Sequence, residues 1–304
     1  ASGFKKGDEI IVPAQTHTAT AHAVEYTGAK AIFADVDILT GNISLEDIKK
    51  KITKKTKGVI IVHMAGHPCE VDKILNFCKK KKIVLLEDCA HAVGTKFKKK
   101  HVGNFGVSGS FSFYPTKQIT TGEGGMVITN DYNFYKKIKK LKAFGIDKDI
   151  KDRKKQGDYD VKSLGFNYRM TDFQAALGFN QIIKYKKNLR QRHLIAKRYI
   201  KNFMNNKKIN HMPYSKDCSF FIFQIFCKNR DKILKELKNK NIGVSVHYSN
   251  ALPKMTYYKK KYNLNIGKFK NADSYGCTNI SLPVYPKLKM TEVDKICKTI
   301  ISLI

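Results

Sequence analysis

One stretch of the sequence decides the fold: GVIIVHMAGHPCEVDKILNFCKKKKIVLLEDCAHAVG, residues 58–94. Its beginning, Gly58–His63, is a continuous apolar run, which is typical of a strand covered on both faces of a sheet. The amphipathic segment Val71–Lys81 predicts a helix, and Ile83–Asp88 predicts the next strand. A strand, a helix and a second strand in this order predict a mainly parallel sheet with right-handed crossovers.

The same alternation continues towards the N-terminus. Asp8–Val12 and Ala31–Asp35 are predicted strands, Thr18–Thr27 is a predicted helix, and Ser44 is a predicted N-cap of another helix. Beyond the opening stretch, Ser110–Tyr114 and Gly125–Thr129 are predicted as strands on either side of a turn. The first half of the chain is therefore expected to be an α/β layer built on one sheet.

A different pattern follows a long predicted helix at about residues 171–204, for which Thr171 is the expected N-cap. Phe220–Phe226 and Val244–Tyr248 are predicted strands, Asp231–Lys240 is a predicted helix, and the last helix is expected to start near Thr291. We therefore expect a large domain at residues 1–185 and a smaller C-terminal α+β domain at residues 186–304, joined by the long helix.

Composition narrows the class of protein. The seven cysteines are spread along 304 residues without a CxxC pair, which favours a reducing cytoplasm over a disulfide scaffold. No apolar run reaches the roughly 18 residues of a membrane span, and no signal peptide is recognisable. The net charge of +33 comes from lysines dispersed over the whole chain. Together with the abundant Asn and Ile, this indicates a compositional bias rather than a nucleic-acid surface.

Two segments carry the chemistry. Asp88 ends a predicted strand, where ligand sites of open α/β sheets lie. Lys117 closes the segment Ser110–Lys117 and precedes the turn Gly122-Glu123-Gly124-Gly125. Taken alone, Lys117 is most simply a solvated turn lysine. A carboxylate and a lysine at neighbouring strand ends are, however, the pair that a pyridoxal phosphate (PLP) enzyme requires, the amine for a Schiff base and the acid for the pyridine nitrogen.

The chain resembles the DegT/DnrJ/EryC1/StrS family of PLP-dependent nucleotide-sugar aminotransferases, which have the fold-type I aminotransferase architecture. The resemblance covers essentially the whole chain and rests on GDEIIVPAQTHTATAHAVEYTGAKAIFADVD (7–37), EDCAHAVGT (87–95), GSFSFYPTKQITTGEGGMVITND (109–131), LGFNYRMTDFQAALG (164–178) and SLPVYP (281–286). The family usually has roughly fifty more residues before the position of Gly7, including a turn that binds the cofactor phosphate, so we expect that this chain lacks that segment.

The resemblance assigns roles in cofactor binding. Lys117 corresponds to the aldimine lysine, which also serves as general acid and base. Asp88 corresponds to the carboxylate that pairs with the pyridine nitrogen, and His91 to the residue near the phenolic oxygen of the cofactor. Ser112 corresponds to a serine that binds the phosphate. His17 lies where the family usually places an aromatic ring over the cofactor.

Further residues carry over to the subunit interface and the substrate. Asn167 resembles an asparagine that reaches the phosphate of the partner subunit's cofactor, which implies a homodimer with shared active sites. Tyr168 and Arg169 are weaker matches for the same interface or for the substrate. His247 and Tyr248 match a His-Tyr pair near the sugar nucleotide, with an ordinary strand end as the alternative.

The expected reaction is transfer of an amino group, from a donor such as glutamate, to the ketone of a nucleotide-linked keto-deoxy-sugar, with the 4-keto position favoured, for surface polysaccharide or related synthesis. A sugar dehydratase of the same family is one alternative, although such enzymes typically have His in place of the lysine. A catalytically silent paralogue or binding module of the same fold is another. His63, His67 and Cys69 have a spacing compatible with a metal, but we expect a structural role and no metal site.

Overall fold

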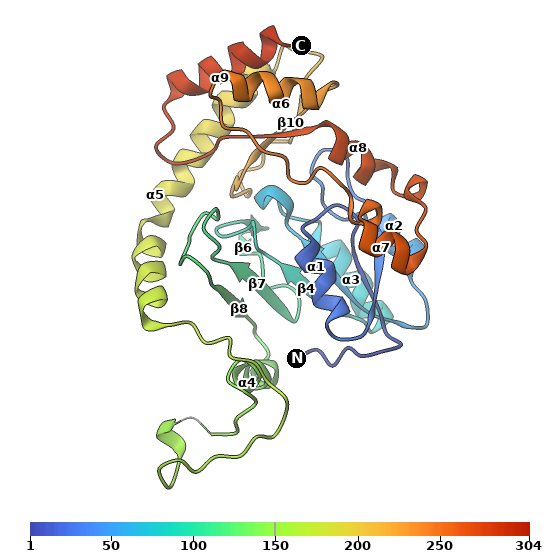
Figure 1. The fold of residues 1–304 in the computed structure, drawn as a ribbon, viewed down its shortest axis with the longest axis vertical. Coiled ribbons are helices and arrows are strands. Elements are labelled where there is room, and N and C mark those ends of the chain that lie inside the picture. Colours follow the sequence, from blue (N-terminus) through green and yellow to red (C-terminus); the bar gives the residue numbers. More distant parts are fainter. Residues whose placement is uncertain (149) are drawn as a thin grey trace.

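The computed structural model describes residues 1–148 and 150–304 and contains a six-stranded sheet. The strands are β1 (Glu9–Pro13), β2 (Lys30–Ala34), β3 (Thr56–Val62), β4 (Val84–Asp88), β7 (Ser108–Ser112) and β8 (Gly125–Ile128), in the order β2-β1-β3-β4-β7-β8. All neighbouring pairs are parallel except β7 and β8, which pair antiparallel. The prediction of an α/β fold with a mainly parallel sheet is therefore confirmed (Figure 1).

Helices connect the strands as the polar and apolar pattern predicted. These are α1 (Thr18–Glu25), α2 (Leu45–Lys51) and α3 (Val71–Lys81); a further helix that was not predicted, α4 (Tyr132–Leu141), follows β8. The Ser44 hydroxyl accepts a hydrogen bond from the Asp47 amide and caps α2, as its position in the sequence predicted. A short hairpin of β5 (Lys96–Phe97) and β6 (Lys100–His101) precedes β7.

The long helix α5 (Asp172–Phe203) leads from the sheet to a second layer (Figure 1). Thr171 caps it in a capping box with Gln174, as predicted from the threonine and the acidic first turn. The second layer is a three-stranded sheet of β9 (Asn210–His211), β10 (Phe223–Phe226) and β11 (Asn279–Leu282), covered by α6 (Arg230–Asn239) and α9 (Met290–Ser302). Short 3-10 helices span Met64–Gly66, Ile150–Asp152, Leu252–Lys254 and Ile266–Lys268.

One predicted strand, Val244–Tyr248, does not form. Only Ser245 makes an isolated bridge, to Ser281. The His247 amide instead donates to the Asn279 side chain (3.1 Å), and the His247 carbonyl accepts from the Gln224 side chain (3.0 Å). Buried amide side chains thus take the hydrogen bonds that a neighbouring strand would have taken, which sequence periodicity does not reveal.

Three large apolar cores pack against the two sheets: the first on one face of the large sheet, the second on its other face beneath α2 and α3, and the third against the small sheet. In the third, α5 packs against β10, β11 and α9 through residues such as Tyr199 and Phe223. The first core contains a return of the chain, because α7 (Thr256–Tyr262) and α8 (Lys270–Thr278) pack against β1, β2 and α1. Tyr258 and Phe269 both contact Phe33 of β2 there. Within the described residues, no helix is both long enough and apolar enough to cross a bilayer.

Candidate active site

The carboxyl end of β4 places Asp88 at the edge of the large sheet. Asp88 pairs in register with Ser110 of β7, so the two strands present their ends side by side. One carboxylate oxygen accepts from the Thr20 hydroxyl of α1 (2.8 Å) and the other from the Ala90 amide (3.0 Å). These two donors fix the carboxylate in one orientation and leave lone pairs on both oxygens free to accept a further hydrogen bond.

Lys117 lies in the turn that follows β7, where its amide donates to the Tyr114 carbonyl (3.0 Å). Its ammonium nitrogen sits over the Phe221 ring, 4.8 Å from the centroid. Burial lowers the pKa of Lys117 to about 8, against the opposing attraction of Asp88. A substantial share of the amine is therefore neutral at slightly alkaline pH, as a nucleophile or base requires.

His91 is buried between two rings of the second layer, those of Phe221 and Tyr248. It stacks on Phe221 with 4.3 Å between centroids, and its Nε2 lies 3.2 Å from the Tyr248 hydroxyl. Burial, and then the Lys117 cation, hold the pKa of His91 well below its usual value, so the imidazole is neutral. Its Nδ1 is buried and has no hydrogen-bond partner among the described residues.

His17 and Ser112 flank this group. His17 caps α1 through Nδ1, which accepts from the Ala19 amide (3.2 Å), and its ring lies 5.5 Å from that of Tyr248. Partial burial and then the Lys117 cation lower the pKa of His17, so this ring is electrostatically coupled to the same centre. Ser112 ends β7, two residues beyond the partner of Asp88, at the same edge of the sheet.

His247 and Tyr248 reach the site from the second layer. Burial and then Lys117 lower the pKa of His247 to about 4, and its Nδ1 lies 3.0 Å from the Ser281 hydroxyl. A cavity of about 330 Å³ opens beside His247, lined also by Thr116, Phe221 and Ser281. The structure thus brings together six of the ten predicted site residues, Lys117, Asp88, His91, His17, His247 and Tyr248, and places Ser112 at the same edge of the sheet.

Asn167, Tyr168 and Arg169 are not part of this group within one chain. In the described part of the chain, their contacts are with one another and with neighbouring residues: the Arg169 Nε donates to the Asn167 side chain (3.0 Å), and Tyr168 stacks on Phe166. The Arg169 guanidinium lies over the Phe144 ring. The Tyr168 side chain is 72% exposed, so this segment presents its polar and aromatic groups outward.

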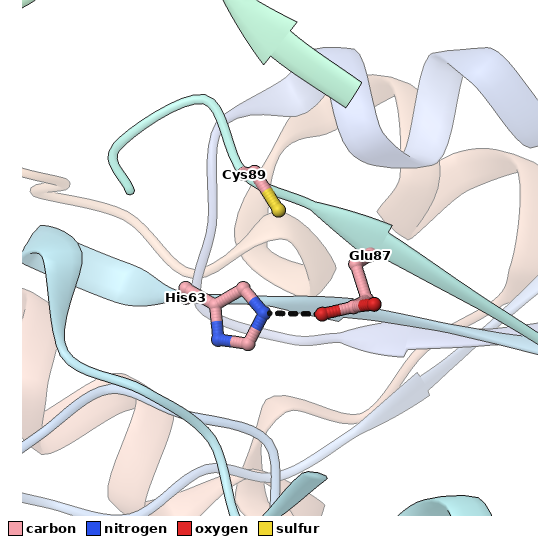
Figure 2. Close-up of side chains that lie close together, drawn as sticks. All are labelled: His63, Glu87 and Cys89. Atoms are coloured by element: carbon pink, nitrogen blue, oxygen red, sulfur yellow. Dashed lines mark hydrogen bonds and ion pairs between the residues drawn. The ribbon is translucent and has the colours of Figure 1, made fainter. Parts of the chain in front are cut away.

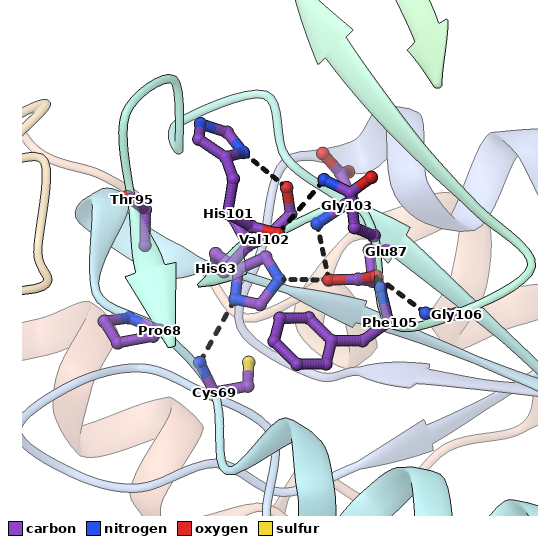
Figure 3. A network of polar contacts seen from close by, with 12 residues as sticks. His63, Pro68, Cys69, Glu87, Thr95, His101, Val102, Gly103, Phe105 and Gly106 are labelled. Atoms are coloured by element: carbon purple, nitrogen blue, oxygen red, sulfur yellow. Dashed lines mark hydrogen bonds and ion pairs between the residues drawn. The ribbon is translucent and has the colours of Figure 1, made fainter. Parts of the chain in front are cut away.

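Directly behind Asp88, the preceding residue Glu87 belongs to a fully buried polar network (Figures 2 and 3). Its carboxylate accepts hydrogen bonds from the amides of Gly103 (2.7 Å), Phe105 (2.7 Å) and Gly106 (2.8 Å), and from His63 Nε2 (3.1 Å). Burial raises the pKa of Glu87, but the hydrogen bonds from His63 and the backbone outweigh it and hold the pKa below its usual value.

His63, Glu87 and Cys89 are the group of described residues whose ligand atoms lie within 4.8 Å of one another, as a metal site requires. His63 Nδ1 accepts from the Cys69 amide (3.1 Å), so Nε2 carries the proton that is donated to Glu87. Both nitrogens and both carboxylate oxygens therefore already have partners. His67, the third residue of the His63, His67 and Cys69 pattern, is not in this group: its Nδ1 lies 3.2 Å from the Pro68 carbonyl oxygen. The network fastens the 103–106 loop to the strand that ends in Asp88.

Some residues of this centre were missed in the sequence. Thr20, which holds Asp88, lies in the matching stretch 7–37 but was given no role there, and Phe221, which touches both Lys117 and His91, lies outside every matching stretch. The pattern of Thr16 and Thr20, one helical turn apart, is the only local signal for the first. Phe221 comes from the second layer and contacts residues that are distant in the sequence. The local sequence pattern does not predict such contacts.

A mainly parallel sheet with a half-buried lysine and a fixed carboxylate at its carboxyl edge, facing an α+β layer, is typical of an enzyme of the fold-type I aminotransferase class. The chain belongs to the DegT/DnrJ/EryC1/StrS aminotransferase family, whose model matches residues 1–301. It is therefore a PLP-dependent sugar aminotransferase by family, and the resemblance read from its motifs is confirmed.

Curated relatives and solved structures agree with this family assignment. GDP-perosamine synthase of Escherichia coli O157:H7 is 37% identical over 99% of this chain and 80% of the relative. A UDP-4-amino-4,6-dideoxy-N-acetyl-beta-L-altrosamine transaminase of Campylobacter jejuni is 32% identical over 100% of this chain and 81% of the relative. Helicobacter pylori PseC, an aminotransferase of pseudoaminic acid biosynthesis, superposes with a TM-score of 0.91 at 30% identity, over 98% of this chain and 80% of that chain.

The residues present fit PLP. A PLP form of Spr1654 from Streptococcus pneumoniae superposes with a TM-score of 0.91 at 28% identity, over 99% of this chain and 82% of that chain. In the chain itself, His91 Nδ1 and the Gln118 side-chain oxygen are buried without hydrogen-bond partners among the described residues, next to Lys117. These unpaired polar atoms lie beside a lysine with a lowered pKa and a fixed carboxylate. A polar aromatic cofactor bound there would supply their missing hydrogen-bond partners.

Proposed function

We propose that this protein transfers the amino group of glutamate to the C4 ketone of a nucleotide-linked 4-keto-deoxy-sugar. Family membership supports transfer to a nucleotide sugar. The name of the Campylobacter relative supports the C4 position, because it describes a 4-amino-4,6-dideoxy sugar. The 33% identical SpsC of Bacillus subtilis, named for spore coat polysaccharide biosynthesis, supports a product destined for a surface polysaccharide.

The observation that carries the proposal is the buried amine of Lys117, with its pKa lowered to about 8, close enough to Asp88 for the carboxylate to act on that pKa. When bound, PLP supplies an electrophilic carbonyl and a ring that accepts the electrons released at the substrate carbon. Lys117 is the nucleophile towards that carbonyl, and its free amine moves the proton on and off the reacting carbon.

The other residues hold this arrangement. Asp88, oriented by the Thr20 hydroxyl and the Ala90 amide, presents an anion to the protonated ring nitrogen of the cofactor. His91 is neutral, and its unpartnered Nδ1 is available for a hydrogen bond to a ring substituent. We place the phosphate near Ser112, at the end of β7, and the His17 ring against the cofactor face.

For the sugar nucleotide we propose the cavity beside His247. Its lining includes the hydroxyls of Thr116, Ser245 and Ser281, which suit the hydroxyl-rich sugar, and the Phe221 ring. His247 lines this cavity, and the hydroxyl of the adjoining Tyr248 lies 3.2 Å from His91. A hydrogen bond between the Tyr248 hydroxyl and His91 would link the substrate cavity to the residues around the cofactor.

We also propose a homodimer with shared sites, in which Asn167, Tyr168 and Arg169 serve the partner's centre. Their position away from Lys117 within one chain supports this, as does the apolar surface around them. The segment 164–166 and the helix α5 expose large apolar side chains: Leu164 is 88% exposed, Phe173 80% and Phe179 66%. A surface of this kind marks an interface. The seven free cysteines support a reducing, cytoplasmic setting for the enzyme.

The test is transfer of nitrogen from ¹⁵N-labelled glutamate. The purified protein with PLP is incubated with a nucleotide-linked 4-keto-6-deoxyhexose or its 3-keto isomer, and the product is analysed by mass spectrometry. We expect ¹⁵N in the 4-amino sugar, and none with Lys117→Ala. Loss of the sugar hydroxyl without nitrogen transfer would indicate the dehydratase. If PLP is not retained and neither reaction occurs, the silent paralogue is the better description.

A further inference from the structure

The Phe221 ring is the point where three reactive side chains of the site meet. The Lys117 nitrogen lies over its face at 4.8 Å, the His91 ring stacks on it at 4.3 Å, and the His247 ring packs against it edge-on at 5.9 Å. Phe221 is buried, with 7% of its surface exposed. An aromatic ring in this position can attract a cation on its face and exclude water from the amine at the same time.

The backbone around Phe221 is fixed from both layers. Its amide donates to the Ala65 carbonyl (3.0 Å), and the preceding Ser219 amide donates to the Gly66 carbonyl (3.0 Å). Its own carbonyl accepts from the buried guanidinium of Arg192 on α5 (3.2 Å). The residue before it, Phe220, is held with φ at +44°, which a non-glycine residue adopts only where the surroundings impose it.

The Ser219 hydroxyl fixes the same segment to the turn that carries Lys117. It lies 2.8 Å from the side-chain nitrogen of Gln118 and 2.8 Å from the Thr95 hydroxyl. A Cβ on Gly66 would come within 2.3 Å of this oxygen, so the close approach depends on a glycine there. The backbone that carries the Phe221 ring therefore has a set position relative to Lys117 and cannot shift without breaking several buried hydrogen bonds, and the ring itself is held by its stack on His91.

We propose that Phe221 is a positioning residue of the aminotransferase, whose ring receives and holds the Lys117 amine whenever that amine is not bonded to the cofactor. This inference rests on the proposed role of Lys117 and deepens it. In each half-reaction the lysine is released while the amino group resides elsewhere, and it then has to deliver and collect a proton at the reacting carbon. A flexible four-carbon side chain free to rotate would spend much of its time in other rotamers.

The ring acts on the amine in two opposing ways. It buries the amine, which lowers the pKa of Lys117, and its face attracts the ammonium, which raises it. Burial dominates, since the pKa is lowered to about 8 from the ordinary 10.5. Phe221→Leu keeps an apolar wall but removes the attractive face, so the pKa should fall by about one unit. Phe221→Ala admits water, so the pKa should rise towards its ordinary value.

The experiment measures the Lys117 amine in the cofactor-free protein. Reductive methylation with formaldehyde and cyanoborohydride at a series of pH values, followed by peptide mass spectrometry, gives the labelling midpoint of Lys117, with exposed lysines of the same digest as reference. We expect opposite shifts for the Leu and Ala variants, and a midpoint close to wild type for Phe221→Tyr. Since no sugar or amino donor is present, the result is independent of which substrate the enzyme uses.

The matched control is Phe203→Leu, the same change at a buried phenylalanine of α5 that contacts Tyr199 rather than Lys117. It should lower the melting temperature and leave the Lys117 midpoint unchanged, which separates positioning from general destabilisation. A Leu variant with a midpoint at or above that of the wild type overturns the proposal. If the Leu variant does not fold, the Tyr variant decides: a displaced midpoint there, with Phe203→Leu unaffected, also overturns it.

Discussion

Replacing Glu87 by Gln removes one negative charge and one acceptor oxygen from the buried network behind Asp88 (Figure 3). If the remaining oxygen stays with the Phe105 and Gly106 amides, the new amide group faces the Gly103 N–H and His63 Nε2–H. Two buried donors then lack an acceptor, at about 1–3 kcal/mol each. We expect a loss of about 3 kcal/mol in the free energy of unfolding, which lowers Tm by roughly 6 °C.

The effect has a defined pH dependence. The folded-state pKa of Glu87 lies below its ordinary 4.5, so the stability contributed by its ionised form is present above pH 4.5 and is lost as the pH falls through the lower, folded-state value. Gln cannot ionise, so the difference in Tm between wild type and Glu87→Gln should shrink as the solution is acidified below pH 4.5.

Thermal unfolding followed by circular dichroism between pH 3 and pH 7 measures both effects. Glu46→Gln is the control, because Glu46 is an exposed residue whose partner is Lys49 on the same helix, and it should leave Tm nearly unchanged. A Glu87→Gln protein with the wild-type Tm at pH 7, or with an undiminished difference at low pH, would refute the reasoning.

Three further outcomes follow from the structure. Asp88→Asn removes the charge that raises the pKa of Lys117, so the labelling midpoint of Lys117 should fall below about 8, and the transfer rate should fall by about 10²-fold or more; an unmoved midpoint would contradict the coupling. Arg192→Met leaves the carbonyls of residues 220, 221 and 284 without their buried donor, and should cost about 3 kcal/mol by urea denaturation, whereas Arg190→Met at an exposed position of the same helix should cost under about 1 kcal/mol. Mixing refolded Lys117→Ala and Asn167→Ala chains in equal amounts should restore about a quarter of the wild-type activity, because only mixed dimers contain one intact shared site; no restoration would argue against sharing.

The fold was predictable where local chemistry determines it. The apolar run Gly58–His63, the Ser44 cap and the Thr171 cap each specify an element through residues adjacent in the sequence. Val244–Tyr248 was wrongly predicted as a strand, because its backbone is hydrogen-bonded to the side chains of Asn279 and Gln224, which are distant in the chain. Alternation alone cannot reveal a partner of that kind.

The site residues also divide into those that the local sequence predicts and those that depend on contacts between distant segments. Asp88 and Lys117 were found from strand ends and a glycine-rich turn, and the resemblance to the family supplied His91 and His17. Phe221 could not be found, because an aromatic residue in an apolar run looks like any core residue until the second layer is placed against the first. The roles predicted for Asn167 and its neighbours concern a second subunit and stay predictions.

The return of α7 and α8 to the first sheet has a consequence for synthesis on the ribosome. Ile10, Val12 and Phe33 leave the exit tunnel well before Tyr258 and Phe269, which cover them and come more than 200 residues later in the chain. At about 5–20 residues per second, that gap lasts roughly ten to fifty seconds. During that interval this apolar face of the sheet is exposed on the nascent chain. We expect a chaperone that holds unfolded chains to bind there.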